Sequence, residues 1–277
     1  MARGISRIAQ AAAFIPAMLL LAPAAHAQVK LDAHYTASLA GISLGKGSWV
    51  IHVGADRYSA VINGGSAGLL KAFAGATGSA LAQGRIISDH FAPAAYLVSI
   101  NSKKTETIRI SFTGPNITNS SIEPEEPHNP EKIPVTEAHL RDVLDPMTAS
   151  LIRIPPGHEP LAASTCQGSS AIFDGRMRYE LRLGYKRMDK VKAEKGYQGP
   201  VVVCSAYFTP VAGYVPDRAA IKYLARQRDM EVWLAPISDR ILVPFKVVIP
   251  TPVGTGILEA TQFIITVAEP GVSAQNQ

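Results

Sequence analysis

Apolar and polar residues alternate with a period of two along most of the chain after Gln28. Runs of this kind occur at 49–53, 108–112 and 241–249. The clearest run covers 177–185, and one face of it carries Met177, Tyr179, Leu181, Leu183 and Tyr185. A period of two is typical of β-strands that bury one face. The pattern therefore predicts a protein built mainly from strands, roughly a dozen in number.

The segments between these runs are short and rich in glycine, proline and asparagine. Short connections of this composition favour antiparallel neighbours over crossover helices. We therefore expect a mainly β fold, in which a curved antiparallel sheet forms a barrel-like or spiral domain with a few short helices. A barrel of this size either fills with side chains or holds a small ligand.

Three short segments have a helical pattern instead. The first covers 66–74, and the second covers about 136–153 with a break at Asp145-Pro146, where Asp suits the N-cap and Pro the first helical position. The third begins at Asp217. The proline-rich, acidic segment from 123 to 134 is predicted to be an exposed loop.

Residues 1–27 have the composition of a secretory signal peptide. Arg3 and Arg7 precede an uncharged run, which ends at the small-residue cleavage site Ala25-His26-Ala27. A membrane anchor is the competing interpretation, but two prolines interrupt the run and no basic cluster follows it. We expect a cleaved leader over 1–27, a single β-rich domain over 28–267, a flexible tail over 268–277, and a soluble periplasmic protein without a transmembrane segment.

Composition agrees with a folded domain. Of the 277 residues, 47% are hydrophobic and 18% are charged, which is enough apolar material for a sizeable core. The formal net charge of +5 includes the two arginines of the leader. Such a weak basic excess gives no indication of nucleic-acid binding.

The chain has two cysteines, Cys166 and Cys204. In an oxidising compartment they can form one disulfide, which is the interpretation we favour. Two buried free thiols are the alternative. A catalytic thiol is less consistent with the sequence, because neither cysteine belongs to a CxxC motif and the nearest histidine, His158, lies in a Pro-Gly loop.

One motif suggests catalysis. Residues 64–68 match G-x-S-x-G, and they lie between a strand-like and a helix-like run, as in the nucleophile elbow of serine hydrolases. The repeated strand and helix alternation of a hydrolase sheet is missing, and no acid or histidine after Ser66 belongs to a recognisable motif. A serine hydrolase that uses Ser66 is therefore the alternative hypothesis, and chance similarity explains the motif better.

We predict no catalytic, cofactor-binding or metal-binding residues, and no cofactor. The histidines after the leader are scattered singly rather than at metal-ligand spacings, and they are His34, His52, His90, His128, His139 and His158. The glycine-rich segments lack the Lys-Ser/Thr of a phosphate-binding loop.

The strongest charged patch lies between Arg176 and Lys195, which holds eight basic and three acidic residues. On a hairpin this patch could attract anionic lipid headgroups or an acidic protein partner. The simpler interpretation is a solvated face whose charges protect a strand from edge-to-edge aggregation.

The chain also resembles an exported bacterial family, domain of unknown function 3108. The matching segments are Ser66-Ala67-Gly68-Leu69-Leu70, Gly84 with Pro93 and Tyr96, Asp145-Pro146, Cys166 with the run from Ile172 to Leu181, Cys204 with Tyr207 and the run from Pro210 to Tyr214, and Val243-Pro244. The resemblance implies a periplasmic, β-rich protein of the cell envelope and supplies no catalytic residues. We therefore expect a non-catalytic protein that supports the envelope by binding an apolar ligand or an envelope protein.

Overall fold

The computed structural model describes residues 28–67, 75–88 and 90–268. The predicted leader and almost all of the predicted tail lie outside the described residues, as does most of the predicted helix at 66–74. Fifteen strands dominate the described part, with four short helices between them. The strands are β1 (Gln28–Leu39), β2 (Ile42–Val53), β3 (Arg57–Ser66), β4 (Thr77–Ile87), β5 (His90–Asn101), β6 (Thr105–Thr113), β7 (Asn116–Glu123), β8 (Ile152–Arg153), β9 (Gly168–Phe173), β10 (Arg178–Lys192), β11 (Lys195–Gly196), β12 (Gln198–Ala212), β13 (Glu231–Ser238), β14 (Ile241–Thr251) and β15 (Gly254–Ala268). The helices are the 3₁₀ turns η1 (Glu137–Leu140) and η2 (Ala163–Cys166) and the α-helices α2 (Pro146–Ala149) and α3 (Ala219–Arg226).

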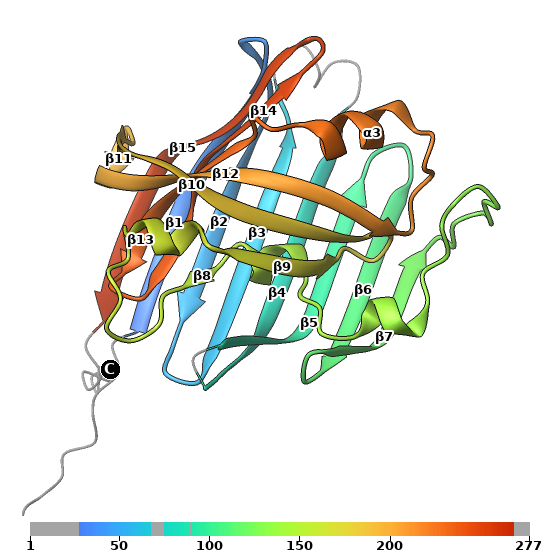
Figure 1. Cartoon of the computed structure of the whole chain (residues 1–277), viewed down its shortest axis with the longest axis horizontal. Coiled ribbons are helices and arrows are strands. Elements are labelled where there is room, and N and C mark those ends of the chain that lie inside the picture. Colours follow the sequence, from blue (N-terminus) through green and yellow to red (C-terminus); the bar gives the residue numbers. More distant parts are fainter. Residues whose placement is uncertain (1–27, 68–74, 89, 269–277) are drawn as a thin grey trace, which may run out of the picture.

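All the strands belong to one sheet. Its order is β7-β6-β5-β4-β3-β2-β1-β15-β14-β13-β12-β10-β9, and neighbours along this path are antiparallel. The sheet curls so that β9, β10 and β12 cross in front of β1–β6 (Figure 1). β7 and β9 are the two ends of the path, so the sheet is curved but not closed. The predicted curved antiparallel fold is confirmed.

Irregular pairing contributes to the curvature. Register shifts interrupt the ladders at several points, including His34/Tyr35, Gln83/Gly84 and Trp233/Leu234. Such bulges bend a strand and increase its twist. At Gly84 the backbones approach so closely that a Cβ atom would lie 2.2 Å from the Ala92 carbonyl oxygen, so this bulge requires glycine.

Alternation places one apolar face of β1–β4 in the main core. The side chains of Leu31, Ala33, Ile51, Ala60 and Ala82 are completely buried there. β12 is different, because both of its faces are buried. Val201 and Val203 join the main core, whereas Val202 and Cys204 form a second, smaller core with side chains that include Cys166, Leu234 and Leu242.

A disulfide joins η2 to β12 within the smaller core. Cys166, at the end of η2, and Cys204, in β12, have their sulfur atoms 1.97 Å apart. Both cysteines are completely buried. The bond therefore fixes the segment that contains β8 and η2 against the β12–β14 part of the sheet.

The helix predictions are partly confirmed. Asp145 is the N-cap of α2 and Pro146 occupies the first turn, as predicted. The remainder of 136–153 is not one helix, because only the single turns η1 and α2 form and the backbone between them is extended or irregular. The helix predicted from Asp217 is α3, which begins two residues later. No helix in the described ranges combines the length and apolar character needed to cross a lipid bilayer.

The disulfide yields a stability prediction. Replacing both Cys166 and Cys204 with alanine should lower the free energy of unfolding by about 4 kcal/mol, because the bond closes a long loop and restricts the unfolded chain. Urea denaturation of oxidised protein, reduced protein and the double variant measures this. Reduction should reproduce the effect of the double substitution, and equal stability of all three samples would contradict the prediction.

Candidate ligand-binding site

One segment of the chain passes through the interior of the curved sheet. We call residues 142–155, which contain α2 and β8, the crossing segment. Its first part is held by β9, since the Leu144 N–H donates to the Ala171 carbonyl at 2.9 Å and the Phe173 N–H donates to the Leu144 carbonyl at 3.0 Å. Its last part pairs with β14 through β8. Both ends of the crossing segment are therefore fixed by backbone hydrogen bonds.

The middle of the crossing segment is fixed by a buried polar network around Asp145. Asp145 Oδ1 accepts hydrogen bonds from the N–H groups of Met147 and Thr148, at 3.0 and 2.9 Å. The Thr148 hydroxyl lies 2.5 Å from Asp145 Oδ2 and 2.7 Å from the hydroxyl of Tyr58 in β3. If Thr148 donates to the carboxylate, Tyr58 donates to Thr148. A side chain of the sheet thus binds α2 directly.

Burial shifts the pKa values of the groups in and around this network. Asp145 and Thr148 are almost inaccessible to solvent. Desolvation raises the pKa of Asp145, although its hydrogen bonds oppose that change. Burial also raises the pKa values of Tyr58, Tyr96 and Tyr179, and the charge of Asp145 adds to the effect on each. These tyrosines stay neutral near pH 7, and Tyr58 joins the network through its hydrogen bond with Thr148.

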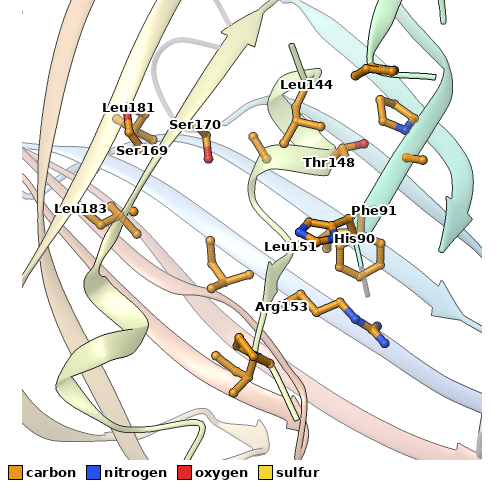
Figure 2. Close-up of a pocket in the computed structure, with 18 of the residues that line it drawn as sticks. His90, Phe91, Leu144, Thr148, Leu151, Arg153, Ser169, Ser170, Leu181 and Leu183 are labelled. Carbon is orange, nitrogen blue, oxygen red and sulfur yellow. The ribbon is translucent and has the colours of Figure 1, made fainter. Parts of the chain in front are cut away.

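A cavity of about 880 Å³ lies beside the crossing segment. One wall is formed by the start of β5, where His90 and Phe91 lie close to Arg153 of β8 (Figure 2). The opposite wall is formed by β9 and β10, where Ser169, Ser170, Leu181 and Leu183 are found (Figure 2). We call this space the main cavity because the crossing segment and two parts of the sheet border it, and a hollow of about 930 Å³ along β1–β4 has a more polar lining.

The lining of the main cavity is mainly apolar. Hydroxyl and amide groups are fewer, and among the described residues four titratable side chains line it: His90, Asp142, Arg153 and His158. Arg153 has its guanidinium 5.7 Å from the centre of the Phe91 ring, a cation–π arrangement. The cavity therefore combines a large apolar surface with a few charged or polar groups, as is typical of small-molecule sites.

A second cavity of about 350 Å³ adjoins the main cavity. It lies between α2, α3 and the strands β10, β12, β13 and β14, and apolar side chains such as Phe208, Leu224 and Val247 line it. The two cavities have five lining residues in common, which are Ala149, Ile152, Ser170, Leu181 and Leu183. The crossing segment and the β9–β10 pair therefore form a shared wall.

The two cavities explain why the apolar face of β10 is only half-buried. Tyr179, Leu181 and Leu183 lie on one face as predicted, but they are only half-buried because they border cavities instead of a packed core. Tyr185 continues this face into solvent and is 47% exposed. The most regular alternation in the sequence therefore marks the wall of a cavity.

Ser66 lies at the end of an antiparallel strand. It is the last residue of β3, where it pairs with Gly45 of the antiparallel strand β2. Its hydroxyl oxygen accepts a hydrogen bond from the Ala76 N–H at 3.2 Å. A nucleophile elbow turns sharply from a strand of an α/β-hydrolase sheet into a helix. The described part of the chain gives the serine-hydrolase hypothesis no such context.

About half of the basic patch at 176–195 is neutralised within the protein. Arg176 pairs with Glu106 and Glu126, and the buried Arg178 pairs with Glu180. Lys186 and Arg187 pair with Glu231, and the Arg187 guanidinium lowers the pKa of that carboxyl to about 2. A solvated face would expose Arg178, but it is only 9% exposed, and its guanidinium donates to the Tyr179 carbonyl and pairs with Glu180.

Two of the scattered histidines, His90 and His158, line the main cavity. No group of three histidine, cysteine or carboxylate side chains in the described ranges could hold a metal ion. The sequence provided two signals for the cavity that were not recognised as such: the alternation at 177–185 and the single charge of Arg153 within the apolar run 151–154.

The fold and the site together define an open, curled β-protein with an interior cavity. A family model described as a protein of unknown function, DUF3108, matches residues 33–261. The chain therefore belongs to the DUF3108 family. A similar solved structure is the β-barrel-like protein of domain of unknown function DUF1849 from Brucella abortus, with 8% sequence identity and a TM-score of 0.44 over 87% of this chain and 98% of that chain. No curated protein matches the sequence.

The Asp145 network yields a prediction about the site. Replacing Asp145 with alanine removes the acceptor for two N–H groups and one hydroxyl, so the free energy of unfolding should fall by about 2–4 kcal/mol. Chemical denaturation measures the loss. Asp217→Ala, near the exposed start of α3, is the matched control and should leave stability nearly unchanged. Equal effects of the two substitutions would contradict the assigned role of Asp145.

Proposed function

We propose that this protein is a non-catalytic binding protein that holds an apolar or amphiphilic small molecule in the main cavity. The observation that carries the proposal is a space of about 880 Å³, lined mainly by apolar side chains, between two parts of one curved sheet. Pockets of about 300–1,000 Å³ with this kind of lining are typical of small-molecule sites. Protein interiors are otherwise packed about as densely as organic crystals.

The way the cavity is built supports a binding role. A carboxyl cap, a tyrosine and two sets of backbone hydrogen bonds hold the crossing segment in place. Such a wall is fixed before a ligand arrives, which reduces the entropic cost of binding. The cavity is therefore suited to holding a ligand without a large rearrangement.

The proposed location is the periplasm. The signal-peptide composition of residues 1–27 supports export, and the Cys166–Cys204 bond is of a kind that persists outside the cytoplasm. Lipids are the abundant amphiphiles of the bacterial envelope. A periplasmic protein with this cavity would support the envelope by binding or carrying such a molecule.

The binding role makes a direct prediction. Leu183 lines both cavities, so Leu183→Trp should fill part of the space and weaken binding of the neutral apolar probe N-phenyl-1-naphthylamine by at least about tenfold, equivalent to about 1.4 kcal/mol. Fluorescence titration measures the affinity, and circular dichroism verifies the fold.

The control substitution is Leu258→Trp, which adds the same side chain at a position 40% exposed in β15. It should leave probe binding unchanged. A folded wild-type protein that does not bind the probe, or equal binding by both tryptophan variants, would refute the proposed site.

A further inference from the structure

We infer that the second cavity holds the far end of an unbranched hydrocarbon chain, whose polar end group stays in the main cavity. This inference rests on the proposed binding function and names the chemical class of the ligand, a single-chain aliphatic compound. It assigns two parts of one ligand to the two cavities, which lie next to each other beside the crossing segment.

The two cavities meet between the crossing segment and the β9–β10 pair. Ala149 and Ile152 of the crossing segment line both cavities. Ser170 of β9 and Leu181 and Leu183 of β10 also line both. Figure 2 shows Ser170 and the β10 leucines on one side of this space and the crossing segment on the other. Because both of these facing elements border both cavities, the cavities are consecutive parts of one space.

Contacts within the protein limit the width of this junction. Toward one end, Leu144 of the crossing segment exchanges two backbone hydrogen bonds with β9. Toward the other end, Ile152 and Leu183 pack against the smaller core. The small side chains of Ala149 and Ser170 lie in the part of the junction between these contacts. A junction bounded in this way admits a flexible alkyl chain more readily than a rigid ring system.

Two polar groups in the lining of the second cavity already have partners within the protein. The Glu231 carboxylate pairs with Arg187 and accepts a hydrogen bond from Trp233 Nε1 at 2.9 Å. The Ser150 hydroxyl donates to the Pro146 carbonyl at 2.8 Å. Groups that are satisfied in this way offer little to a polar ligand. The lining that remains is mainly apolar and suits a hydrocarbon.

The main cavity suits the polar end of the ligand. It is the larger of the two, with about 880 Å³ against about 350 Å³. Its lining also includes the hydroxyl and amide side chains of Ser164, Thr165 and Gln167. A ligand with one polar end therefore places that end in the main cavity and extends its chain past the β10 leucines into the second cavity. Each CH₂ group that leaves water on this path contributes to affinity.

The test measures how affinity depends on chain length. Hexan-1-ol, octan-1-ol, decan-1-ol and dodecan-1-ol share one neutral end group and differ only in the length of the chain. Isothermal titration calorimetry, below the solubility limit of each alcohol, should show that the affinity of the wild-type protein rises about fourfold for each added CH₂ group, equivalent to about 0.8 kcal/mol. An affinity that stops rising at octanol would overturn the inference, because the longer chains would then find no further cavity.

A substitution in the second cavity locates the end of the chain. Val247 of β14 lines the second cavity and is not among the residues that line the main cavity. Val247→Trp should therefore leave hexanol binding unchanged and weaken dodecanol binding at least about tenfold, equivalent to about 1.4 kcal/mol. Val253→Trp is the matched control, because Val253 is 71% exposed in the turn between β14 and β15, and it should bind both alcohols as the wild type does.

Equal dodecanol binding by the two tryptophan variants would overturn this inference and leave the proposed function intact. Failure of the wild-type protein to bind any of the alcohols would overturn both. A crystal structure of the wild-type protein with 12-bromododecan-1-ol decides the question even if Val247→Trp does not fold. The anomalous signal of the bromine should lie beside Phe208, Leu224 and Val247 in the second cavity. A bromine in the main cavity, or outside both cavities, would overturn the inference.

Discussion

The capping of α2 by Asp145 is the interaction on which the interior of this protein depends. The strands β9, β10 and β12 cross in front of β1–β6, and the cavity lies between these two parts of the sheet (Figure 1). The crossing segment occupies part of that space, and its short helix has too few internal hydrogen bonds to be stable alone. Asp145 supplies acceptors for two of its N–H groups, and Thr148 joins it to Tyr58. This network fixes the middle of the crossing segment, which lines the cavity.

Contacts outside the Asp145 network also hold the crossing segment in place. The disulfide and the smaller core hold the end of the crossing segment against β12–β14, and β8 adds a strand pair with β14. The pairing of Arg187 with Glu231 joins the long strand β10 to β13. A space of ligand size is therefore maintained by several independent constraints.

Local patterns in the sequence predict much of this fold. The alternation at 49–53 and 241–249 identifies strands, and Asp145-Pro146 identifies the start of α2, because both signals depend on short-range geometry. The position of the crossing segment depends on contacts between distant residues, such as Tyr58 with Thr148, and no local pattern encodes them. Local sequence patterns do not reveal the cavity either. Alternation shows that Leu181 and Leu183 share a face but not whether that face meets a packed core or an open space.

Native mass spectrometry of the protein isolated from the cells that produce it tests the central claim most directly. The account predicts a non-covalent complex of the mature chain with a small amphiphile, which is released by organic solvent and is lost when Leu183 is replaced with tryptophan. A mature chain that consistently carries no ligand, under conditions that preserve a known lipid-binding protein with its lipid, would contradict it.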